Sequence, residues 1–147
     1  MSIKKIGFMQ GRLSNQINNK IQSFPWHNWE KEFAEAKKIN INLMEWTLDY
    51  YKIFSNPILT SKGQDKINKL KAKHKIKIES VTGDCFMQKP FWKFSKKGRL
   101  KLQKDFKSII NSLKNIGIKI IVVPLVDNGK IENKFQNEVL IDFFLKI

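Results

Sequence analysis

The sequence is poor in cysteine and in long apolar runs, and each shortage excludes a class of protein. A single cysteine, Cys85, cannot form an internal disulfide, so a disulfide scaffold is excluded and a reducing, cytoplasmic location is expected. No apolar run approaches the roughly 20 residues of a membrane-spanning helix, and the basic start lacks the cleavage site of a signal peptide. We therefore expect one globular domain over residues 1–147, with no membrane partner.

Arginine is also scarce, although the formal net charge is +15. Of the 28 basic residues only Arg12 and Arg99 are arginine, whereas proteins that read bases and phosphates lean on the planar arginine fork. No zinc-finger, homeodomain, KH or RRM pattern is present. We therefore predict no specific nucleic-acid partner and assign the lysines to solvated outer faces of helices. A surface for an anionic partner is the alternative reading of the lysine-rich stretch 62–107.

Four strand-like apolar runs are each followed by a helical pattern. The runs cover residues 5–9, 43–48, 76–81 and 118–126, and the last, the most apolar, reads as a strand buried on both faces. Polar residues end the runs at Gln10, Asp49, Asp84 and Asp127. Successive strand–helix units of this kind form a parallel sheet with right-handed crossovers. The sequence thus predicts an α/β fold whose strand ends share one edge, where ligands bind in such folds.

The helical segments carry recognisable ends. We expect Pro25 to open the first helix, which buries Trp29, Phe33 and Ala36. Ser61 is expected to cap a second helix through residue 74, and a third runs over 95–115 until Gly117. A fourth starts near residue 138. Residues 13–23 are expected to form a loop.

The segment after the third strand combines a thiol with four aromatic residues. Cys85 has no evident histidine partner, so we expect a small, partly buried thiol and no nucleophile. Phe86, Phe91, Trp92 and Phe94 follow it. They form either a lid over the strand ends or the packing of a long loop.

Glycine-rich phosphate loops are missing as well. Gly11 and Gly83 each stand alone after a strand, which argues against a nucleotide-binding open sheet. Four βα units are then either a small open sheet or the first half of an eight-stranded barrel, which takes about 250 residues when complete.

Several blocks of the sequence resemble sugar phosphate isomerase/epimerase proteins, which are xylose-isomerase-like TIM barrels. The chief blocks are Ile6–Leu13 (IGFMQGRL) and Ile21–Trp26 (IQSFPW); the others are Met44–Trp46, Asn56–Ile58, Ser80–Val81, Asp84–Met87 and Val123–Asn128. They occur in order and cover nearly the whole chain. The resemblance implies a parallel (βα)4 half of a TIM barrel that ends before strand five.

The same resemblance implies that the metal site of the family lies outside this chain. In that family a divalent metal is held by carboxylates and a histidine on the last four strands, so the metal site would lie beyond Ile147 and this chain is expected to bind none. The chain would be a partial gene, a truncated product or one piece of a split protein. Endonuclease relatives of this barrel class, which bind zinc through histidines at strand ends three and four, are excluded because Asp84 and Asp127 stand there.

Polar and aromatic residues at the strand ends are the candidate ligand contacts. Glu45 is either a contact to a sugar hydroxyl or a buried carboxylate paired with a lysine or a backbone N–H. Asp84 and Asp127 are either ligand-lining groups or turn and cap residues. Arg12 is either an oxyanion contact or a surface residue. The predicted substrate-binding set is Gln10, Arg12, Trp26, Glu45, Trp46, Asp84, Phe86, Asp127 and Asn128; no catalytic residue and no metal ligand is assigned.

Two functions follow from these expectations. The first is an isomerase or epimerase half-barrel that acts on a sugar or sugar phosphate. The mechanism of the resembled family is metal-dependent proton transfer next to a carbonyl, and we expect this half-barrel to be inactive alone. The alternative is a non-catalytic half-barrel module that binds an anionic ligand or self-associates, because open half-barrels expose two sheet edges and an apolar face.

Overall fold

The protein is an α/β chain with one four-stranded sheet. The structure, a computed structural model, describes residues 6–15 and 23–147. The strands are β1 (Gly7–Met9), β2 (Leu43–Thr47), β3 (Lys77–Thr82) and β4 (Ile120–Val122). The helices are α1 (Lys31–Lys38), α2 (Ser61–His74), α3 (Asp84–Gln88), α4 (Lys96–Lys114) and α5 (Lys134–Phe144), with short 3-10 turns η1 (Ile53–Ser55), η2 (Pro57–Leu59), η3 (Phe91–Lys93) and η4 (Asp127–Gly129).

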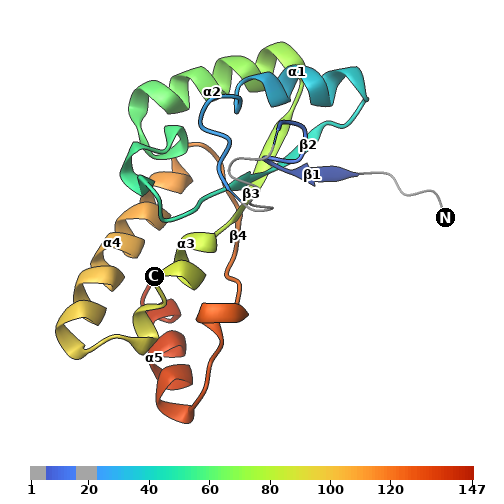
Figure 1. Ribbon diagram of the computed structural model, residues 1–147. Coiled ribbons are helices and arrows are strands. Elements are labelled where there is room, and N and C mark those ends of the chain that lie inside the picture. Colours follow the sequence, from blue (N-terminus) through green and yellow to red (C-terminus); the bar gives the residue numbers. More distant parts are fainter. Residues whose placement is uncertain (1–5, 16–22) are drawn as a thin grey trace.

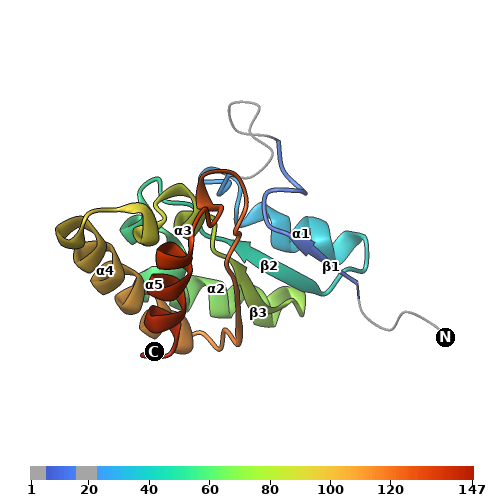
Figure 2. The same cartoon turned by 90° about the horizontal axis from the view of Figure 1, so that it is seen from below.

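All neighbouring strands pair in parallel, in the order β1-β2-β3-β4. The predicted α/β class and parallel order are therefore confirmed. α1 and α2 lie along one side of the sheet and α4 and α5 continue around it, while no described helix crosses the opposite face (Figures 1 and 2). This arrangement is compatible with half of a barrel. β1 and β4 are the two edge strands.

The helix-facing side of the sheet forms the core. Trp46 on β2 is fully buried, with its ring 5.6 Å from that of Trp29 and 5.4 Å from that of Phe24. Phe33 and Ala36 of α1 are also buried, as predicted together with Trp29. The alternation of buried and less buried residues along β2 arises because successive side chains of a strand point to opposite faces.

The aromatic segment after β3 packs as a second part of the core. The Phe86 ring lies 4.3 Å from that of Phe106 on α4, and the Phe91 ring lies 4.6 Å from that of Phe143 on α5. Trp92 is buried too. Of the two alternatives for this segment, loop packing holds for these residues, because their rings fill the space between α3, η3 and the two long helices.

Two helices begin at other residues than predicted. α1 begins at Lys31, not at Pro25, because the Pro25 carbonyl accepts the N–H groups of Asn28 and Trp29 at 2.8 Å in a preceding turn. α5 begins at Lys134, four residues earlier than expected, because Asn133 Oδ1 accepts the N–H of Gln136 at 2.9 Å.

The other helix ends lie close to their expected places. α2 ends at His74 as predicted, and its cap is Thr60, whose hydroxyl accepts the Gly63 N–H at 3.2 Å, while Ser61 is the first helical residue. Gly117 follows α4 with φ +81°, the left-handed conformation that ends a helix. Within the predicted loop 13–23, residues 16–22 lie outside the described part of the chain.

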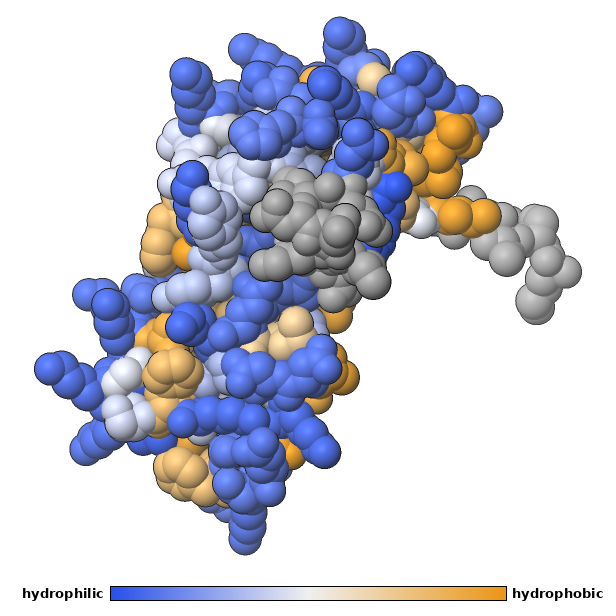
Figure 3. Space-filling view, viewed as in Figure 1, coloured by the Kyte–Doolittle hydropathy of each residue, from blue (hydrophilic) through white to orange (hydrophobic). Residues whose placement is uncertain are grey.

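The fourth strand differs most from its prediction. A strand over 118–126, buried on both faces, was expected; β4 covers only Ile120–Val122 at the sheet edge. Ile120 is 58% exposed and Val122 42% exposed. Their side chains lie on the sheet face that no described helix covers, whereas Ile121 pairs with Val81 and packs on the core side. Figure 3 shows further hydrophobic surface at its upper right, beside β1 and the end of α1.

In the described residues no helix has both the length and the hydropathy needed to span a bilayer.

Candidate functional site

The carboxyl ends of the strands are tied into one polar edge, which we call the rim: Gln10, Glu45, Thr47, Asp49, Thr82 and Asp84. The Gln10 N–H donates to the Glu45 carbonyl at 2.8 Å, and the Leu48 N–H donates to the Thr82 carbonyl at 3.0 Å. The Cys85 N–H donates to the Leu48 carbonyl at 2.9 Å. The backbone thereby brings three of the four predicted strand ends, at Gln10, Asp49 and Asp84, to one edge of the sheet.

Gln10 is anchored by one end of its amide. The Thr47 hydroxyl donates to the Gln10 carbonyl at 2.9 Å, and the Thr47 N–H donates to Gln10 Oε1 at 3.2 Å. These bonds fix which amide atom faces Thr47. Gln10 Nε2 is buried without a hydrogen-bond partner among the described residues. The rim thus contains an oriented donor that has no partner among the described residues.

Glu45 contacts a neighbouring strand. The Thr82 hydroxyl donates to Glu45 Oε1 across the pair β2–β3. The sequence left two alternatives for Glu45, a ligand contact or a pair with a lysine or a backbone N–H. The structure pairs its carboxylate with the Thr82 hydroxyl, which is neither of the two predicted partners. Glu45 is half-buried, and the hydrogen bond from Thr82 fixes the orientation of its carboxylate.

Asp84 is the most unusual group of the rim. Its residue is 1% exposed, and within residues 6–15 and 23–147 neither carboxyl oxygen has a hydrogen-bond partner. Burial, then the negative charges of Asp49 and Glu45, raise the Asp84 pKa to about 6, while Arg12 lowers it. A buried polar group that lacks a partner costs free energy. With its pKa near 6, this carboxyl can donate a hydrogen bond when it is protonated and accept one when it is charged.

Asp49 and Trp26 extend the rim on the side of the first loop. Asp49 Oδ2 accepts the Phe24 N–H at 2.9 Å. The Trp26 ring meets the Phe24 ring edge-on at 4.9 Å, and Trp26 Nε1 is a buried donor for which the described part of the chain offers no partner. Within residues 6–15 and 23–147, the rim and its border therefore hold two donors, Gln10 Nε2 and Trp26 Nε1, and one carboxyl, Asp84, for which no hydrogen-bond partner is found.

Glu32, which we did not predict as a functional residue, organises the first loop. Its carboxylate accepts the N–H of Gly11 at 2.9 Å and of Leu13 at 3.0 Å, and the hydroxyl of Ser14 at 3.1 Å. Burial raises the pKa of Glu32 above its ordinary value, although these three hydrogen bonds act in the opposite direction. The sequence signal was its spacing: three residues after Trp29 and four before Ala36, Glu32 lies on the buried face of α1.

Four predicted site residues lie elsewhere. Trp46 and Phe86 are buried in the core on the helix side, where Trp46 Nε1 donates to Asn56 Oδ1 at 3.0 Å. Asp127 is exposed in η4 with φ +49°, as its turn reading predicted. Asn128 is also exposed, and its amide donates to the Met87 carbonyl at 3.2 Å. The side chains at these four positions do not lie at the rim. Side chains alternate between the two faces of a strand, and the length of a loop sets how far its residues lie from the strand end, so both decide which side chains reach the rim.

In the described residues no group of three or more His, Cys, Asp or Glu side chains could hold one metal ion. We therefore derive no step of the function through a metal bound by residues 6–15 and 23–147.

The chain was compared with models of protein families, with curated proteins and with solved structures, and none of them matched.

Proposed function

We propose that the rim binds a sugar or sugar phosphate, and that the chain acts as the N-terminal half of an isomerase or epimerase barrel like the family it resembles in sequence. Asp84 carries this proposal: a buried carboxyl, its oxygens lacking partners among the described residues, stands at the carboxyl end of a parallel strand. Ligands of parallel α/β folds bind at this end.

Hydroxyl groups are the ligand chemistry that the rim suits. Each hydroxyl donates one hydrogen bond and accepts others, so a hydroxyl has the chemistry to pair with Asp84, with Gln10 Nε2 or with Trp26 Nε1. Arg12 lies close enough to lower the Asp84 pKa. The planar guanidinium group of an arginine such as Arg12 can bind a phosphate group through two parallel hydrogen bonds. The acid–base groups for isomerisation are not among these residues, so the chain alone is expected to give no turnover.

Calorimetric titration tests the proposal. The probes are fructose 6-phosphate and ribose 5-phosphate, with inorganic phosphate as the control for attraction to the net charge of +15. We expect the sugar phosphates to bind more tightly than phosphate, and Asp84→Asn to weaken them by about tenfold because a charged hydrogen bond is lost. Asp127→Asn, which removes an exposed carboxylate, should leave binding unchanged. Sugar phosphates that bind no better than phosphate would contradict the proposal.

Self-association is the second candidate function, and the exposed edge favours it. Ile120, Val122, Leu125 and Val126 are all exposed along or after β4. An all-parallel sheet normally has both faces covered. A module that pairs through this edge would bury these side chains without any catalytic step.

A further inference from the structure

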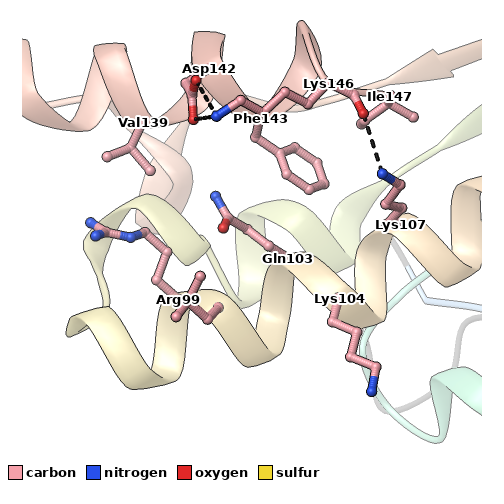
Figure 4. A pocket seen from close by; sticks show the side chains of 10 residues that line it. Arg99, Gln103, Lys104, Lys107, Val139, Asp142, Phe143, Lys146 and Ile147 are labelled. Atoms are coloured by element: carbon pink, nitrogen blue, oxygen red, sulfur yellow. Dashed lines mark hydrogen bonds and ion pairs between the residues drawn. The ribbon is translucent and has the colours of Figure 1, made fainter.

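A groove between α4 and α5 stands apart from the rim. It has a volume of about 490 Å³, and all its lining residues come from α4, α5 and the residues after α5. Figure 4 shows it between the two helices. Small-molecule sites have volumes of about 300–1,000 Å³. The groove is thus large enough for a small organic ligand.

The floor and one wall of the groove are apolar. Phe143 is 6% exposed and is fixed by its contact with the Phe91 ring at 4.6 Å. Figure 4 shows its side chain pointing between the helices. Leu100 on α4 is 57% exposed, and Val139 on α5 is partly buried. A ligand with an apolar body would cover Leu100 and complete the burial of Val139, which stabilises a complex by the hydrophobic effect.

The charge of the groove is positive. Among its lining residues the bases are Arg99, Lys104, Lys107 and Lys146, against one acid, Asp142. Lys146 binds that acid at 2.6 Å. Lys107 reaches from α4 toward α5, where its ammonium donates to the Lys146 carbonyl at 3.3 Å and not to a carboxylate (Figure 4). Lys104 points away from α5 in the same view. A carboxylate beside Lys107 would therefore meet a cation that has no acidic partner among the described residues.

We propose that this groove binds a small amphiphilic anion, with its chain against Leu100, Val139 and Phe143 and its carboxylate at Lys107. Both halves of the ligand are needed: the apolar floor disfavours a bare inorganic anion, and the excess positive charge disfavours a cation with the same chain. The proposal is independent of the rim and of its ligand.

Amide chemical-shift titration of the whole chain with decanoate, below its micelle concentration, tests the proposal. We expect shifts concentrated on α4 and α5, and at least about fivefold weaker binding of decyltrimethylammonium. Lys107→Gln should weaken decanoate by about fivefold, while Lys101→Gln, which removes an exposed charge from the same helix outside the groove, should have little effect. Leu100→Gln should weaken it by about fivefold, and Leu145→Gln, at a more exposed site outside the groove, should not.

Three outcomes would overturn the proposal. Equal losses in Lys107→Gln and Lys101→Gln would reduce the effect to net charge. Shifts confined to β4 would place decanoate on the exposed sheet edge. Shifts of α4 and α5 amides that depend on protein concentration, without decanoate, would make a second copy of the chain the occupant of the groove.

Discussion

Both carboxylate oxygens of Glu32 lie 2.9 Å from the backbone nitrogen of Gly11, so a helix residue holds the loop that leaves β1. The same carboxylate accepts from Leu13 and Ser14. Gly11 has φ +92°, a conformation that other residues rarely adopt. The first loop of the rim is therefore positioned by α1.

Replacing Glu32 should destabilise the protein markedly. Glu32→Ala removes the acceptor for three donors and is expected to lower the free energy of unfolding by about 3 kcal/mol, and Glu32→Gln by less because it keeps one acceptor oxygen. Urea denaturation measures both. Glu35→Gln, in an ion pair on the outer side of α1, is the control and should change stability by less than about 0.5 kcal/mol. An effect of Glu32→Ala as small as the control's would refute the role assigned to Glu32.

Asp84 should make stability fall as the pH rises. Its pKa rises from the ordinary value of 3.8 for an aspartate to about 6 in the folded protein. The folded state thus binds more protons between these values, and the free energy of unfolding decreases across this range by up to about 3 kcal/mol. Asp84→Asn removes this cost, so it should stabilise the protein at pH 8 and have little effect at pH 4. Denaturation curves at both pH values check this, with Asp127→Asn as control; equal effects at pH 4 and pH 8 would contradict it.

Cys85 should be inert in the folded protein. The residue is completely buried, and burial raises its thiol pKa far above the usual range. We expect Ellman's reagent to modify it only at the rate of unfolding, and in full once urea is added. Rapid modification without denaturant would show that the thiol is accessible.

The exposed edge should cause self-association at high protein concentration. Ile120→Lys places a charge on the uncovered face of β4 and is expected to shift sedimentation toward the monomer. Phe54→Lys is the matched control, since Phe54 is 57% exposed and Ile120 58% exposed. The second candidate function fails if the unmodified chain stays monomeric at high concentration or if both variants sediment alike.

The sequence predicted the strand–helix order because apolar spacing differs between the two elements. Phe33 and Ala36 mark a helix face, and the alternation around Ile78 marks a strand. The burial of residues 118–126 was not predictable in this way, because an apolar run does not show how much of it pairs in the sheet or which of its faces another element covers. Trp46 and Phe86 were misplaced because the side of the sheet that an aromatic residue faces depends on register and on the packing of distant helices.

The sequence predicted only some of the residues at the rim, because the rule it relied on describes where strands end and not how loops fold. Gln10, Glu45 and Asp84 follow from the rule that parallel strands end at one edge. The role of Glu32 depends on a loop that returns to its own helix, which strand-end rules do not describe. Asp127 and Asn128 lie in a turn five or more residues beyond the end of β4, so the length of that connection carried them away from the edge.

The most direct test of the central claim is the carbon-13 signal of the Asp84 carboxyl, followed by NMR as fructose 6-phosphate is added. We predict that the Asp84 signal titrates near pH 6 without ligand and shifts on saturation, while the Asp127 signal stays in place. An Asp84 signal that does not move with fructose 6-phosphate, or that moves equally with inorganic phosphate, would contradict a sugar-binding rim.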